Sequence, residues 1–189
     1  MCRLASSAYR RFDVSGPTPS RRLDGDAILD DPLVRELLDA RLVGVLATFD
    51  PAGGIHAVPM WFALDERSVI LATSSLSRKV ENLDDDRRST LVVHDSRPGF
   101  EVCGVSMVGT VEIVRDSGAR RLVELVHRRY VADEGVEDPS VAAFLASDDV
   151  ALRLRPGSAF TWDERRSPAS EALRRGRHAL PLVSTNPRA

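Results

Sequence analysis

Short apolar segments separated by turn-forming residues constrain what this chain can fold into. Val43–Phe49 and Ile55–Leu64 are apolar and rich in β-branched residues, and Asp50-Pro51-Ala52-Gly53-Gly54 lies between them. A second turn over residues 65–68 leads to another apolar segment, Val69–Thr73. Segments of this length with hairpin-length connections pair as antiparallel neighbours. The region therefore predicts three consecutive β-strands.

Later segments of the same kind extend the sheet. They are Ser89–Asp95, Glu101–Val114, Val150–Arg155 and a short Ala159–Asp163. Gly104 and Gly109 lie inside the longest one, which indicates sharp bends or a bulge, as in a small barrel where a strand turns a corner. Pro59 lacks an N–H donor, so the strand that carries it should have an edge, a bulge or a ligand at that point.

Helical signals are fewer. Asp31 and Pro32 are well suited to start a helix that ends near Arg41, because Asp can cap free N–H groups and Pro is tolerated in the first turn. Other predicted helices cover residues 77–84, 117–130 and 140–146. The alternation of strand and helix that builds parallel sheets is absent, so we predict a mainly β fold, an antiparallel barrel with added helices.

The ends of the chain differ from its middle in charge. Residues 1–23 carry five arginines and one aspartate, and residues 165–189 carry six arginines and one glutamate, whereas the whole chain has a net charge of −2. We predict an extended arm (1–24), a folded domain (25–163) and a basic tail (164–189). An acidic body argues against a nucleic-acid-binding domain, whose basic residues should lie on the folded surface.

Composition also bears on location. No run approaches the ~18 apolar residues that span a bilayer, so no membrane association is expected. The first residues lack the apolar segment of a secretory signal, which predicts a cytoplasmic protein. The two cysteines, Cys2 and Cys103, are too few for a disulfide framework and do not form a metal-binding pair.

The most distinctive segment is Leu71–Leu83, LATSSLSRKVENL. It contains Lys79, the only lysine in a chain with 26 lysines and arginines. Hydroxyl groups, a helix N-terminus and a compact cation together favour a phosphate or a carboxylate. The alternative interpretation is an ordinary solvated helix start.

Other motifs carry little chemistry. Gly104-Val105-Ser106-Met107-Val108-Gly109 resembles a nucleophile elbow, but its glycine spacing is one residue too long and no helix follows it. The four histidines lie far apart in sequence and lack metal-ligand spacing, so no metal is predicted. The acidic run at residues 84–86 is most simply a solvated turn. No catalytic residue is assigned.

The order of several segments resembles the FMN- and F420-binding split β-barrel family, the pyridoxamine 5'-phosphate oxidase-like proteins. The matching segments are Val45–Thr48 with the following turn, Val58–Phe62, Leu71–Thr73, Ser77–Leu83, Gly109–Val111, Leu152–Pro156 and Thr161–Asp163. The resemblance implies an antiparallel six-stranded split β-barrel and a homodimer with two cofactor sites at the subunit interface.

The resemblance also implies which residues bind the cofactor. Ser77, Arg78 and Lys79 would hold its phosphate, with Thr73, Ser74 and Asn82 as hydrogen-bond partners. Along the edge of the cofactor ring system the resemblance implies Val58, Pro59, Met60 and Trp61, and Ala72 belongs to the same set. For Trp61 and Phe62, plain core packing is an equally good interpretation.

The family uses several cofactors. The segments here look most like the branch that uses coenzyme F420, a deazaflavin, with FMN as the alternative; haem is disfavoured because no histidine lies in a matching motif. The implied function is an oxidoreductase that transfers hydride to or from an unidentified small molecule. A non-catalytic flavin or deazaflavin carrier on the same fold, or a barrel whose site has decayed, stays open. Pyridoxamine phosphate oxidation is disfavoured, since Arg97 and Arg155 are the only candidates for a second phosphate.

Overall fold

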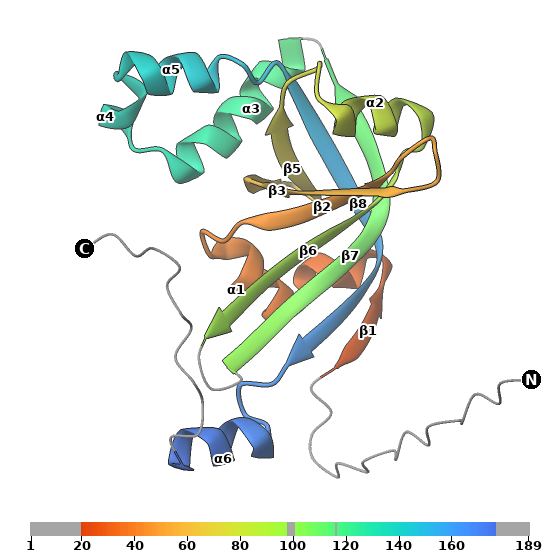
Figure 1. The fold of residues 1–189 in the computed structure, drawn as a ribbon, viewed down its shortest axis with the longest axis vertical. Helices are drawn as coiled ribbons and strands as arrows, with labels where there is room; N and C mark the ends of the chain where they lie inside the picture. Colours follow the sequence, from red (N-terminus) through yellow and green to blue (C-terminus); the bar gives the residue numbers. More distant parts are fainter. Residues whose placement is uncertain (1–19, 98–100, 116, 177–189) are drawn as a thin grey trace, which may run out of the picture.

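The computed structural model describes residues 20–97, 101–115 and 117–176. Over these residues the chain is a curled antiparallel sheet with helices packed against it (Figure 1). The predicted fold class, mainly β with added helices, is confirmed. No helix in this part of the chain is long and apolar enough to cross a membrane.

Eight strands form the described sheet, in the order β3-β2-β6-β7-β8-β5-β4, with β1 paired to β8. Their bounds are β1 Arg21–Asp24, β2 Gly44–Phe49, β3 Ile55–Met60, β4 Phe62–Asp65, β5 Ser68–Thr73, β6 Arg88–Arg97, β7 Glu101–Val114 and β8 Val150–Asp163. All the pairings are antiparallel.

The number of strands differs from the predicted six for three reasons. The predicted strand 55–64 breaks at Trp61, since β3 pairs with β2 whereas β4 pairs with β5. The two predicted segments at 150–155 and 159–163 form one continuous strand, β8. Residues 21–24, predicted as part of the arm, form β1, where Leu23 packs against the core.

A bulge bends the two longest strands, as the glycines predicted. Val108 pairs with Ser158, but Gly109 pairs with Pro156, so Gly157 has no partner across the ladder. A Cβ on Gly109 would lie 2.1 Å from the carbonyl oxygen of Arg155, so only glycine fits there.

The predicted helices are present with small changes of bounds, and three short ones are added. The helices are the 3₁₀-helix η1 Gly25–Asp30, then α1 Pro32–Asp39, α2 Arg78–Asp85, α3 Ser117–Tyr130, α4 Asp133–Val136, α5 Pro139–Leu145 and α6 Pro168–Gly176. The Asp31 carboxylate caps α1 by accepting from the N–H groups of Leu33 and Val34 at 3.0 and 3.2 Å, as its sequence predicted.

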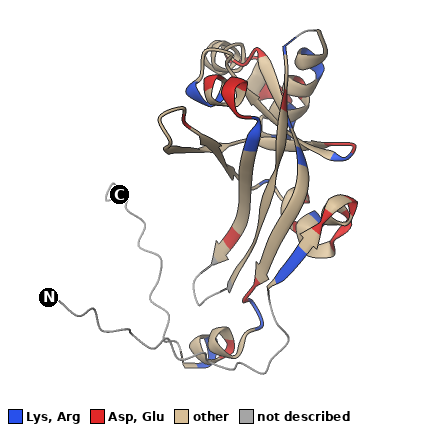
Figure 2. Cartoon of the chain, turned by 90° about the vertical axis from the view of Figure 1, so that its right-hand side faces the viewer, with Lys and Arg blue, Asp and Glu red and all other residues tan. Residues whose placement is uncertain are grey.

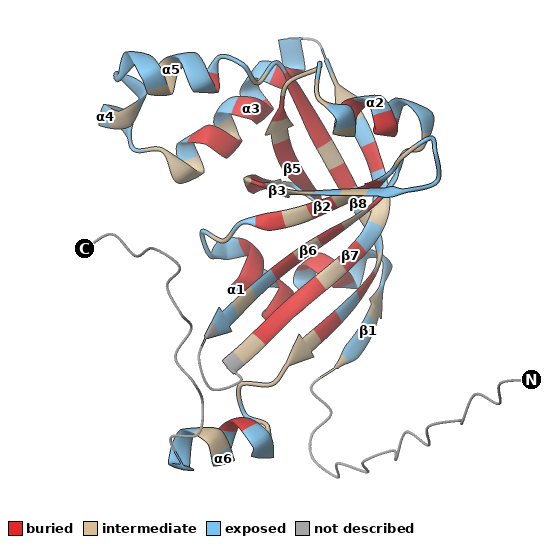
Figure 3. Ribbon diagram, viewed as in Figure 1, coloured by how far each residue is buried: buried red, intermediate tan, exposed pale blue. Residues whose placement is uncertain are grey.

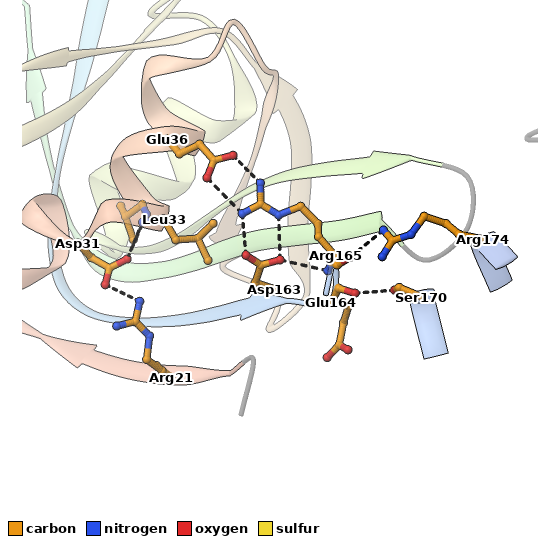
Figure 4. A network of polar contacts seen from close by, with 10 residues as sticks. Arg21, Asp31, Leu33, Glu36, Asp163, Glu164, Arg165, Ser170 and Arg174 are labelled. Carbon is orange, nitrogen blue, oxygen red and sulfur yellow. Dashed lines mark hydrogen bonds and ion pairs between the residues drawn. The ribbon is translucent and has the colours of Figure 1, made fainter. Parts of the chain in front are cut away.

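Helix α6 lies in the predicted tail, and a polar network joins the segment before it to the barrel (Figure 4). Arg165 contacts Asp163 at 2.6 Å and Glu36 of α1 at 2.5 Å. The Ser170 hydroxyl donates to the Glu164 carbonyl at 2.5 Å. These contacts order residues that the arginine- and serine-rich sequence had suggested to be extended.

Apolar side chains fill two layers, on opposite faces of β5. Figure 3 shows buried residues, in red, along the strands and on α1, α2 and α3. Val69 and Leu71 face the main core inside the curl, beside α1 and α2, whereas Ile70 and Ala72 face a second cluster beneath α3. This alternation is the period of two of a β-strand. Strand β5 therefore separates α2 from α3, and its C-terminal end carries the candidate site.

Candidate functional site

The only lysine of the chain packs against the end of β5. Its ammonium donates to the Thr73 hydroxyl at 3.0 Å, and that hydroxyl lies 3.2 Å from the Ser77 hydroxyl. Thr73 is buried, whereas Lys79 and Ser77 are half-buried. We call Thr73, Ser77 and Lys79 the lysine cradle.

The turn between β5 and α2, residues 74–77, positions this cradle. The Ser77 N–H donates to the Ser74 carbonyl at 3.1 Å, and the Leu76 N–H lies 3.3 Å from the Ser74 hydroxyl. Ser77 is the N-cap of α2, but its hydroxyl makes no capping hydrogen bond. That hydroxyl instead contacts the Thr73 hydroxyl, which accepts from the Lys79 ammonium.

Burial makes Lys79 an unusual cation. Desolvation lowers its pKa, and the nearby negative charge of Asp148 opposes that shift. Among the described residues, it forms no ion pair with a carboxylate, and Thr73 is its hydrogen-bond partner. An ammonium has three donors, so a cation with one neutral partner at a helix N-terminus fits an anionic ligand such as a phosphate.

Asn82 serves to hold α2 on the sheet. Its side chain is 1% exposed, and its amide nitrogen donates to the Thr48 hydroxyl on β2 at 3.0 Å. Thr48 is buried as well, and its hydroxyl lies 3.4 Å from the His56 carbonyl. Asn82, which the resemblance implies as a cofactor partner, thus uses its amide N–H inside the protein.

Arg78 turns away from the lysine cradle. It forms an ion pair with Asp50, which lies in the turn between β2 and β3. The Arg78 side chain is largely exposed. The Ala52 N–H and, second, the Arg78 guanidinium lower the pKa of the Asp50 carboxyl. The pair ties the start of α2 to the β2–β3 hairpin. Figure 2 shows both acidic and basic residues on the helices at the upper end of the sheet.

The residues implied at the ring edge lie on β3, at one end of the described strand order. Val58 pairs with Leu46, Pro59 with Val45 and Met60 with Gly44. Pro59 is exposed and Met60 is buried. Pro59 was predicted to mark an edge, a bulge or a ligand, and of these the described sheet shows the edge, since β3 ends its strand order.

Trp61 and Ala72 lie on the other face of β5, with α3. The Trp61 ring stacks on Tyr130 with centroids 4.9 Å apart and an interplanar angle of 3°, and it meets the edge of Phe144 at 6.2 Å. Phe62 is fully buried. The packing interpretation that the sequence left open is thus observed for both aromatic residues, and the structure does not bring Trp61 or Ala72 to the cradle.

Two carboxylates that sequence reasoning missed do border the cradle. Asp149 accepts from the Ser75 N–H and the Ser75 hydroxyl, both at 2.6 Å. Asp148 lies 2.9 Å from the His127 ring and also lines a cavity of about 560 Å³ between α3 and α5. No local motif marks these residues, because the β5–β8 pairing brings them to the turn from 74 positions away.

Other chemistry finds little support in the described residues. They contain no cluster of histidine, cysteine or acidic side chains that could hold a metal ion. Burial raises the pKa of the Cys103 thiol, which opposes formation of a reactive thiolate.

Comparisons with known proteins agree with one another. The sequence profile described as pyridoxamine 5'-phosphate oxidase matches residues 31–163. A conserved hypothetical protein from Mycobacterium tuberculosis is 27% identical, with a TM-score of 0.60 over 81% of this chain and 89% of that one. An F420 reductase is 26% identical, with a TM-score of 0.51 over 66% of this chain and 94% of that one.

A more distant structure shares the fold alone. The haem storage protein HutZ from Vibrio cholerae is 15% identical, with a TM-score of 0.56 over 70% of this chain and 94% of that one. No curated protein is significantly similar to the chain.

Proposed function

This chain belongs to the pyridoxamine 5'-phosphate oxidase family, and we propose that it is an oxidoreductase that binds coenzyme F420, or alternatively FMN. In this proposal the bound cofactor exchanges hydride with a small molecule. The observation that carries it is the lysine cradle, a half-buried cation at a helix N-terminus that donates to the Thr73 hydroxyl, which in turn contacts the Ser77 hydroxyl. The similarity to an F420 reductase favours the deazaflavin.

The cradle suits the phosphate that F420 and FMN both carry. Lys79 would supply a charge-assisted hydrogen bond, and Ser77 and Thr73 would supply hydroxyl donors. The first N–H groups of a helix lack a carbonyl partner four residues earlier, so those of Arg78 and Lys79 at the start of α2 would add main-chain donors. Arg78 would join them only by leaving Asp50.

The bound ring would supply the hydride chemistry, so the protein's own task is binding and orientation. Strand β3 offers a free edge whose main-chain groups can hydrogen-bond to a polar ring rim, and Pro59 removes one donor there. We include Val58, Pro59 and Met60 in the proposed site on this ground. Trp61 and Ala72 would act from the far face of β5, by supporting the strands.

We also propose that the protein is a cytoplasmic homodimer in which a second copy completes each site. Large apolar side chains left exposed on the described surface support this, since a partner would cover them. They include Ile55, Leu76 and Phe160, with 72%, 95% and 50% of their surface exposed. We place the cofactor domain at residues 21–163, because β1 pairs with β8. This start lies before the 25–163 predicted from the sequence, and the rest of 1–24 and 164–189 are proposed as extensions.

A second candidate is a cofactor carrier without turnover. It is favoured by the absence, among the described residues near the cradle, of a group free for proton transfer. His127 is bonded to Asp148, and Thr73 to Lys79.

Titration of the purified protein with F420 and with FMN, followed by cofactor fluorescence, tests the proposed function. Saturable binding of one of them in the micromolar range or tighter is expected. Binding of neither would refute the proposal. Turnover with a panel of hydride donors and acceptors then separates the enzyme from the carrier, which would bind cofactor without any reaction.

A further inference from the structure

Asp149 holds the turn between β5 and α2, residues 74–77, by hydrogen bonds. Its two carboxylate oxygens accept from the N–H and the hydroxyl of Ser75, both at 2.6 Å. Its own N–H donates to the Thr73 carbonyl at 3.2 Å, next to the last ladder pair, Thr73 and Val150. One residue at the start of β8 thus holds both the end of β5 and the middle of the turn.

The neighbouring residue, Asp148, connects Asp149 to helix α3. The Asp148 carboxylate lies 2.9 Å from Nε2 of His127, a side chain of α3 that is 8% exposed. Helix α3 packs on β5 and β8, across the sheet from α2 (Figure 1). Asp148 and Asp149 together therefore connect helix α3 on one side to the β5–α2 turn on the other.

Besides hydrogen bonds among its own residues and Thr73, the turn has little packing to fix it. Its one large apolar side chain, Leu76, is 95% exposed among the described residues. The other members are serines, which bury almost no apolar surface. Hydrogen bonds from an ionised carboxylate are stronger than neutral ones. The Ser75 hydrogen bonds lower the pKa of Asp149, so the ionised form is the one that holds the turn.

We propose that Asp149, anchored through Asp148 to α3, is a positioning residue for the lysine cradle and its phosphate ligand. The identity of the ligand rests on the proposed function, but the geometry of the turn does not. Asp149 carries the same charge sign as a phosphate, so it is unsuited to contact the ligand itself. Its effect on binding must pass through the placement of Ser77 and Lys79.

Hydrogen exchange on the cofactor-free protein tests the positioning itself. In Asp149→Ala, the Ser77 amide, which bonds to Ser74 and not to Asp149, should exchange about tenfold faster, a factor within the range for loss of one or two hydrogen bonds. The matched control is Asp39→Asn, another exposed surface aspartate, on α1. Amides of α3 should exchange alike in all three proteins. Unchanged exchange at Ser77 would overturn the proposal.

A double-mutant cycle with Lys79 tests the link to binding. Asp149→Ala should weaken cofactor binding roughly three- to tenfold when Lys79 is present. In the Lys79→Ala background the same change should have little effect, because the misplaced group is already gone. An equal loss in both backgrounds would show that Asp149 acts elsewhere, and would also overturn the proposal.

Thermal unfolding separates this role from a general structural one, since the midpoint should be nearly the same for Asp149→Ala and Asp39→Asn. If the wild-type protein binds neither cofactor, the proposed function fails, while the exchange experiment still decides whether Asp149 fixes the turn.

Discussion

The buried pair between Asn82 and Thr48 predicts a specific loss of stability. Replacing Asn82 with Ala removes the amide that donates to the Thr48 hydroxyl at 3.0 Å, at a site where the two side chains are 1% and 2% exposed. The Thr48 hydroxyl keeps the His56 carbonyl as its own acceptor. The loss therefore has two parts, one hydrogen bond and the space that the amide filled.

The hydrogen bond contributes about 0.5 to 1.5 kcal/mol. A cavity in a well-packed site adds to this, so the free energy of unfolding should fall by about 2 to 3 kcal/mol in all. For a chain of this size that corresponds to a decrease in melting temperature of roughly 4 to 12 °C.

Urea denaturation of Asn82→Ala, Thr48→Val and the double variant measures both the loss and the coupling. We expect a coupling free energy of about 1 kcal/mol between the two positions. Thr48→Val keeps the shape of the side chain and serves as the matched change at the acceptor. Additive effects, or an Asn82→Ala loss below about 0.5 kcal/mol, would refute the assignment of Asn82 as the residue that holds α2.

Three further changes follow from other contacts. Gly109→Ala should destabilise the protein by more than about 1 kcal/mol in urea denaturation, because its Cβ would lie 2.1 Å from a main-chain oxygen. Gly54→Ala should cost less, since its Cβ would meet Asp50 at an ordinary contact distance of 3.8 Å. The hydrogen bond from the Arg165 guanidinium is the main cause that lowers the pKa of the Asp163 carboxyl, so the pair stabilises the fold above the unfolded-state pKa and loses this effect as the pH falls through the lowered pKa. Asp163→Asn should therefore flatten that part of the curve of stability against pH. An unchanged curve would contradict the assignment. Burial lowers the pKa of Lys79, so its positive charge opposes folding below that pKa, and this penalty decreases as the pH rises. The melting temperature of Lys79→Met at pH 7 without ligand should therefore be at least that of the wild type. A lower melting temperature would contradict this account.

Local sequence signals predicted much of the fold because the physics behind them is local. The turn at residues 50–54 predicted the β2–β3 hairpin, Asp31 predicted the start of α1, and Gly109 predicted the bulge. Each depends on the conformational limits of one or two residues. Pro59 likewise predicted an edge strand, since a residue without an N–H cannot serve a central ladder.

The remaining features depend on partners distant in the chain. The apolar run 55–64 has no turn residue at Trp61, so its division between β3 and β4 follows only from which strands pair. Helix α6 lies in an arginine-rich segment, and the contacts of Arg165 with Glu36 that precede it join residues 129 positions apart. Asp149 has no motif around it, and its role depends on the β5–β8 pairing.

The candidate site was predicted in part. The sequence singled out Lys79, and the structure places it with Thr73 and Ser77 as one group. Arg78 was grouped with Lys79 because the two are adjacent, but neighbouring residues on a helix point about 100° apart, and Arg78 meets Asp50 instead. Sequence adjacency therefore overstates how many cations face one ligand.

The measurement that tests the central claim most directly is the dissociation constant of F420 and FMN for wild-type protein and for Lys79→Ala, in the same buffer. The account predicts saturable binding of at least one cofactor, weakened in the variant by about 1.5 to 3 kcal/mol, or roughly 10- to 150-fold, because a charge-assisted contact is lost. Arg22→Ala, a change on β1 away from the cradle, is the control and should bind as wild type does. An unchanged dissociation constant in Lys79→Ala, or no binding of either cofactor to the wild-type protein, would contradict the account.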